Sequence, residues 1–140
     1  MKRLLARFVT NQSIHRLAAG VLIFGMLVTQ VAASPVIRIK FKLGATKVAV
    51  VGRLRGQNDR VHYLLRVRAN QHMHISVDST RLTNPQIDVV FPSGENMERD
   101  MQGTQFDTDA TQAGDYRIDV FEGRKGAPSN GTFVLRITVD

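Results

Sequence analysis

The stretch YLLRVRANQHMHISV, residues 63–77, decides the fold class of this chain. Apolar residues occupy every second position in both of its halves, which are separated by the tripeptide Ala69-Asn70-Gln71. A period of two is typical of a half-buried β-strand, so the stretch predicts two strands that each turn one face toward a hydrophobic core. The inward positions are Tyr63, Leu65, Val67, Met73, Ile75 and Val77.

The connection between these two strands predicts a hairpin. If both apolar faces point into the core, Val67 pairs with Met73, because a slip of one residue would turn every side chain to the other face. Residues 69–71 then form a three-residue loop. Such loops usually need one residue in the left-handed region, which Asn70 tolerates better than most residues.

The remainder of the chain after residue 33 continues the pattern. In residues 37–43, alternate apolar side chains share one face and Gly44 ends the strand. A short strand is expected near Phe106, and 116–121 and 133–139 are expected to pair as the closing hairpin. The other apolar runs are 48–54 and 87–91. Seven or eight short strands without any helical period predict an all-β fold, a small antiparallel β-sandwich spanning residues 34–140 as a single domain.

Residues 1–33 have the order of a secretory signal peptide. Four cations and no acid precede or border the apolar run Leu17–Val31, and Val31-Ala32-Ala33 supplies small residues before Ser34. The rival interpretation is an uncleaved membrane anchor, but the run is 15 residues long, against the roughly 20 that span a bilayer. We therefore expect cleavage before Ser34, release into the periplasm and no stable membrane insertion.

Charge argues against a nucleic-acid partner. The chain has 19 Lys and Arg residues, 12 Asp and Glu residues and a net charge of +7, and residues 1–33 contribute 4 of the cations. The remaining 107 residues therefore carry a net charge of only +3. A nucleic-acid footprint would need a denser basic cluster.

Two groups of residues raise the possibility of a metal. His72 and His74 project from the same face of one strand, as an imidazole pair would. The predicted register, however, places Arg68 and Arg66 opposite them, and these cations would repel a metal ion. The segment Asp107-Thr108-Asp109 lacks the spacing of a calcium loop. We therefore expect neither a metal nor another cofactor.

Catalysis is not expected either. The chain has no cysteine, and no serine stands in a nucleophile elbow. A mechanism with paired carboxylates stays open, because any two acids could meet in the fold. Small exported sandwiches of this composition generally bind other molecules, so the sequence predicts a protein that is not an enzyme.

The segment QAGDYRIDVFEGRKGAP, residues 112–128, contains the residues most suggestive of a function. Tyr116 follows Gly114 at the start of a strand, which is typical of a tyrosine corner whose phenol bonds to the preceding backbone. The other end of the strand leads into a loop that carries Arg124 and Lys125. Charged residues at a loop tip are usually just solvated. The alternative is that these two cations bind in an acidic cleft of another protein.

The chain resembles the periplasmic inhibitors of goose-type (g-type) lysozyme. The resemblance runs from FKLG (41–44) through GRLRG (52–56) and residues 63–77 to residues 113–139. The family has a Ser-Gly-x-Tyr motif, then a strand, then a loop with arginine and alanine. The positions that match are Gly114, Tyr116, Arg124 and Ala127, whereas Ala113 replaces the serine and Pro128 replaces a second arginine. A related broad class, the pre-peptidase C-terminal-like sandwich, shares the general strand pattern.

This resemblance implies an exported protein that blocks the active-site cleft of g-type lysozyme. The lysozyme-binding residues it implies are Ala113, Gly114, Asp115, Tyr116, Arg124 and Lys125. The competing hypothesis is a secreted, non-catalytic binding module for a glycan or a protein.

Overall fold

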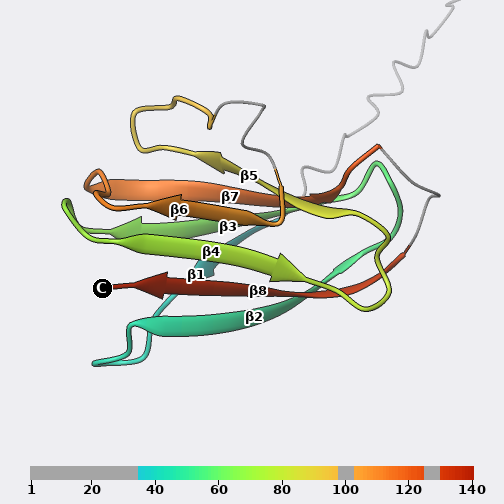
Figure 1. Cartoon of the computed structure of the whole chain (residues 1–140), viewed down its shortest axis with the longest axis horizontal. Helices are drawn as coiled ribbons and strands as arrows, with labels where there is room; N and C mark the ends of the chain where they lie inside the picture. The colour runs from blue at the N-terminus through green and yellow to red at the C-terminus, as the bar shows by residue number, and fades with distance from the viewer. Residues whose placement is uncertain (1–34, 98–102, 125–129) are drawn as a thin grey trace, which may run out of the picture. The chain divides into compact units, whose positions relative to one another are not determined.

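The computed structural model describes residues 35–97, 103–124 and 130–140. The predicted signal peptide, residues 1–33, lies outside these residues, and so do Lys125, Ala127 and Pro128. Eight strands and no helix are described (Figure 1). They are β1 (Val36–Ile39), β2 (Lys47–Leu54), β3 (Arg60–Val67), β4 (Met73–Asp78), β5 (Pro85–Val90), β6 (Gln105–Thr108), β7 (Gly114–Glu122) and β8 (Gly131–Val139).

The strands form two four-stranded sheets. The first has the order β1-β3-β7-β5 and the second the order β2-β8-β4-β6. All neighbours are antiparallel except β1 and β3, which run parallel. The prediction of a small, mainly antiparallel β-sandwich is confirmed. Within the described part of the chain, no helix is long and apolar enough to cross a membrane.

Alternate side chains of the central strands fill the core between the sheets. All six inward positions predicted in residues 63–77 are buried. Tyr63 of the first sheet meets Phe133 of the second edge to face, with ring centroids 6.4 Å apart. The period of two therefore identified the correct face of β3 and β4, because only that face is apolar enough to be withdrawn from water.

Both predicted hairpins are wrong. β3 pairs with β1 and β7, whereas β4 pairs with β6 and β8, so residues 68–72 connect the two sheets. The strands β7 and β8 are likewise in different sheets. Asn70 does adopt the left-handed conformation, with φ of 59°. A left-handed residue reverses the chain equally well within a sheet and between two sheets, so it could not reveal the pairing.

The first strand is shorter than the alternation predicted. β1 ends at Ile39, which is buried, while Ile37 is half exposed and Leu43 is fully exposed in a turn. The chain leaves the first sheet after residue 39 to reach β2 in the second. The apolar alternation continues to Leu43, but the pairing of β1 with β3 ends at Ile39, so residues 40–43 are not part of the strand.

Gly52 leads to a prediction about packing between the sheets. A Cβ atom at this position would collide with the ring of Phe133 and would lie 2.6 Å from the hydroxyl of Tyr63. Both are buried aromatic side chains, and forcing extra volume into a packed core costs about 1–3 kcal/mol. We expect Gly52→Ala to lower the free energy of unfolding by that amount in a urea titration. The matched control is Gly103→Ala, where nothing lies within 4 Å of the added atom. Equal stability of the two variants would contradict the prediction.

Candidate functional site

A tyrosine corner stands at the start of β7, as predicted. Tyr116 is 1% exposed, and its hydroxyl accepts a hydrogen bond of 2.8 Å from the amide of Gln112. Gly114 has φ of 139°, and a Cβ there would lie 2.7 Å from a side-chain carbon of Pro92. The motif glycine is thus required by both backbone conformation and space. We call residues 112–116 the corner.

Asp115 in the corner is already paired. Both of its carboxylate oxygens accept hydrogen bonds of 3.1 Å from Arg38 on β1. These bonds, followed by the charges of Arg38 and Arg66, hold the pKa of Asp115 below its usual value. The pair links β1 to β7 across β3, so Asp115 has a structural partner within the chain.

A group of arginines gathers at the opposite end of the sandwich. Arg124 lies two residues after the end of β7, Arg55 directly follows β2, and Arg81 lies between β4 and β5. In Figure 1 the loops after β2 and β4 lie at the same end of the molecule as the C-terminal end of β7. All three arginines are exposed. We call Arg55, Arg81 and Arg124 the arginine end.

Backbone and side-chain contacts hold the loops of the arginine end together. Gln57 Nε2 lies 3.5 Å from the carbonyl oxygen of Arg124, and the amide of Gly123 donates to the carbonyl of Asn84 at 2.8 Å. Arg81 packs against Gly131, which pairs with Leu54 directly before Arg55. These contacts place three cations from separate loops on one end of the fold.

One carboxylate lies beside the arginine end, that of Asp59, and it accepts a hydrogen bond of 2.9 Å from the backbone amide of Arg55. Among the described residues, none of its three arginines has an ion pair. Glu122, the acid closest to Arg124 in sequence, is only 2% exposed and accepts a hydrogen bond of 3.2 Å from the amide of Thr83. An acidic partner could therefore bind these arginines without first displacing a carboxylate of the protein itself.

The predicted site residues do not form one site. The corner and Arg124 lie at opposite ends of β7. Arg124 lies eight positions after Tyr116, a distance of about 26 Å along an extended chain. Ala113 is exposed and lies beside the corner's glycine, while Lys125 is outside the described residues. Arg55 and Arg81 were missed, because only the topology shows that their loops meet that of Arg124.

A polar cluster on the outer face of the first sheet also went unnoticed in the sequence. Asp119 has a side chain only 4% exposed, 2.7 Å from His62 Nδ1 and 3.2 Å from Arg117 Nε. Asp88 of β5 lies directly opposite it. Two acids therefore do meet in the fold, but His62 and Arg117 engage Asp119, as expected of an ion cluster that joins strands.

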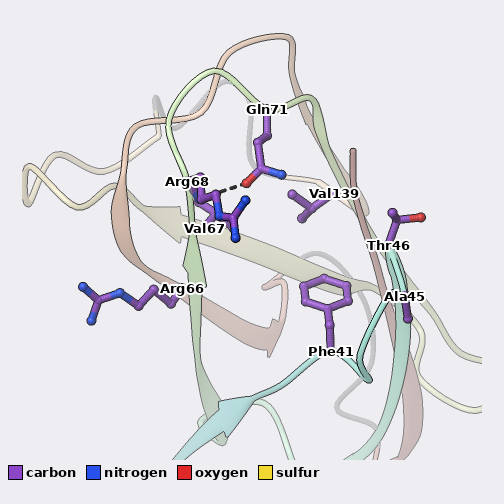
Figure 2. A pocket seen from close by; sticks show the side chains of 9 residues that line it. Phe41, Ala45, Thr46, Arg66, Val67, Arg68, Gln71 and Val139 are labelled. Atoms are coloured by element: carbon purple, nitrogen blue, oxygen red, sulfur yellow. Dashed lines mark hydrogen bonds between the residues drawn. The ribbon is translucent and has the colours of Figure 1, made fainter.

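An open pocket of about 630 Å³ lies near the corner, between the β1–β2 connection and the end of β3 (Figure 2). Phe41 and the guanidinium of Arg68 point into it, whereas Arg66 extends away. Gln71 accepts a hydrogen bond of 2.9 Å from the backbone amide of Arg68 and so supports this wall. An aromatic ring beside a cation suits a ligand with both apolar and anionic or hydroxyl-bearing parts.

The structure is similar to solved structures of two periplasmic inhibitors of g-type lysozyme. The inhibitor from Aeromonas hydrophila has 20% sequence identity and a TM-score of 0.60, over 75% of this chain and 96% of that chain. The inhibitor from Salmonella Typhimurium has 14% identity and a TM-score of 0.55, over 77% of this chain and 100% of that chain. The resemblance noted in the sequence is thus confirmed at the level of the fold.

The broader class is found as well. The pre-peptidase C-terminal domain of a collagenase from Bacillus anthracis has 15% identity and a TM-score of 0.52, over 77% of this chain and 97% of that chain. No protein-family model and no curated protein sequence matches the chain.

Proposed function

We propose that this protein is an exported inhibitor of g-type lysozyme and that its arginine end enters the active-site cleft of the enzyme. The observation that carries the proposal is the similarity to two such inhibitors over 96% and 100% of their own lengths. Those inhibitors are periplasmic, which supports the same location for this chain. The predicted signal peptide, residues 1–33, supports export independently.

The electrostatics of the arginine end suit this target. Lysozymes cleave their substrate with acidic side chains in a cleft. An arginine pairs with a carboxylate through short, charge-assisted hydrogen bonds, often two at once. Arg55, Arg81 and Arg124 are free of ion pairs among the described residues, so their pairing with such acids breaks none within the protein.

The corner has a different part in the proposal. Its glycine and tyrosine match the family motif, and its contacts with Gln112 and Pro92 make it rigid. Because it lies about 26 Å from Arg124, we propose that it maintains the sandwich while the arginine end makes the main contact. Ala113 and Asp115 then influence inhibition only through the fold.

A turbidity assay tests the proposed function. The purified protein is added in increasing amounts to g-type, c-type and i-type lysozymes on a cell-wall substrate. We expect clearing by the g-type enzyme to slow in proportion to the protein added, with smaller effects on the other two. Unchanged clearing by all three enzymes would rule out the inhibitor function.

A second candidate function is a non-catalytic binding module. It is favoured by the pocket that contains Phe41 and Arg68 and by the similarity to a pre-peptidase C-terminal domain. Retention of the protein on insoluble peptidoglycan or another glycan, without any inhibition of lysozyme, would support it. If the variant Phe41→Ala were no longer retained, the glycan-binding site would be assigned to this pocket.

A further inference from the structure

A cluster of histidines and aspartates lies on the outer face of the second sheet. His74 is in β4, and His72 is the residue directly before that strand. The two histidines are two positions apart, so their side chains project from the same face. Asp107 of β6 is the ladder partner of His74, and Asp109 follows the end of β6. We call these four residues the histidine cluster.

The distances within the histidine cluster are close to those of metal ligands. Asp107 bridges the histidines, with Oδ1 3.0 Å from His72 Nε2 and Oδ2 2.8 Å from His74 Nδ1. Ligand atoms of His72, Asp107 and Asp109 all lie within 4.8 Å of one another. Around a tetrahedral Zn²⁺ ion with bonds of about 2.0–2.1 Å, neighbouring ligand atoms are about 3.3 Å apart. His72, Asp107 and Asp109 therefore form the group whose ligand atoms are mutually close, and His74, which contacts Asp107 alone, would have to turn toward an ion held by that group.

The surroundings of His72 also favour a metal. Its Nδ1 lies 3.2 Å from Asp140 Oδ1, which leaves Nε2 directed toward Asp107. A carboxylate that holds the second ring nitrogen of a histidine is the usual arrangement at zinc sites, where it orients the ring and strengthens the ligand. Asp140 is a backbone partner of His72 on the side of β8, so the ladder itself positions this carboxylate.

The sequence-based reason for excluding a metal does not hold. It required Arg66 and Arg68 to face His72 and His74 across a hairpin. Arg66 is in β3, in the other sheet, and Arg68 follows that strand. His74 instead lies opposite Asp107 of β6 and Thr138 of β8, and His72 lies beside Asp140. The third ligand that the sequence did not reveal is thus supplied by β6.

We propose that the histidine cluster binds one Zn²⁺ ion through the imidazoles of His72 and His74 and the carboxylates of Asp107 and Asp109. Imidazole with carboxylate suits zinc and its neighbours in the first transition row, whereas Ca²⁺ and Mg²⁺ prefer sites built from oxygen alone. The ion ties β4 to β6, a four-residue strand at the edge of the sheet. Binding of the ion requires neither the arginine end nor the inhibition of lysozyme.

Isothermal titration of the full chain with Zn²⁺ tests this proposal, using protein purified without a polyhistidine tag. We expect one ion per chain. The double variant His72→Ala/His74→Ala should lose saturable binding, and Asp107→Asn, which preserves the side-chain volume, should weaken it strongly. Asp140→Asn should weaken it about 10- to 100-fold, as the loss of an orienting carboxylate does.

His62→Ala is the matched control. His62 is a partly exposed histidine bonded to an aspartate, but it lies in the other sheet, so zinc binding should be unchanged. The double variant also retains His62, which would preserve any non-specific binding by imidazole. A melting curve in EDTA verifies that each variant is folded. The proposal is overturned if Zn²⁺ gives no saturable binding, if the double variant binds as the original chain does, or if Ca²⁺ competes equally.

Discussion

Replacing Tyr116 with alanine should lower the free energy of unfolding by about 3–5 kcal/mol, the loss typical of a large buried aromatic residue. The side chain is 1% exposed, and its ring packs edge to face on Phe91 with centroids 5.6 Å apart. It also accepts the hydrogen bond from Gln112 that closes the corner. The melting temperature should fall by about 12 °C or more in a calorimetric scan.

Two further variants divide this loss into its parts. Tyr116→Phe retains the ring and removes only the acceptor for Gln112, so it should cost about 1 kcal/mol. Arg117→Ala changes the adjacent, exposed residue of β7 and removes its ion pair with Asp119, which Arg60 and His62 still contact, so it should cost less than Tyr116→Ala. If Tyr116→Ala were as stable as Arg117→Ala, Tyr116 would not have the structural role assigned to it.

Replacing Arg124 with alanine should weaken binding to g-type lysozyme by roughly 2–5 kcal/mol if Arg124 pairs with a desolvated carboxylate in the cleft. This corresponds to a dissociation constant larger by about 30-fold to several thousand-fold. The stability of the free protein should stay within about 0.5 kcal/mol, because Arg124 is exposed and its only described hydrogen bond is made by its backbone oxygen. A binding titration and a calorimetric melt on the same variant measure both quantities.

Arg66→Ala is the matched control for Arg124→Ala. Arg66 is also exposed and without an ion pair among the described residues, but it lies opposite Asp115, at the corner. Its removal should leave the affinity for lysozyme nearly unchanged. The reverse result, in which Arg66→Ala weakens binding and Arg124→Ala does not, would move the contact to the corner. Unchanged affinity in both variants would leave Arg124 as a solvated loop residue.

The sequence predicted the features that depend on neighbouring residues. The tyrosine corner joins Gln112 to Tyr116 over four positions, so a local motif is enough to reveal it. The inward faces of β3 and β4 follow from alternation alone. Asn70 was correctly expected in the left-handed conformation because few other residues tolerate it.

Features that depend on which strands are neighbours could not be predicted in the same way. Alternation shows which face of a strand is buried, but it does not show which strand lies beside it. The sequence was interpreted as pairing β4 with β3, whereas β4 pairs with β6. The contact between His74 and Asp107 was therefore not predicted. The grouping of Arg55 and Arg81 with Arg124 was hidden for the same reason, because it depends on three loops that meet only in the folded sandwich.

The strand order also has a consequence for the folding kinetics. Among the strands of the described residues, no two that follow one another in sequence are neighbours in a sheet. The longest-range pair joins β2 to β8, with Lys47 opposite Thr138. No local hairpin can therefore act as a nucleus, and the entropy of closing large loops is lost before any ladder forms. Such chains fold on the slow side for their size, in milliseconds to seconds, and β2 has no partner in its sheet until the last strand joins it.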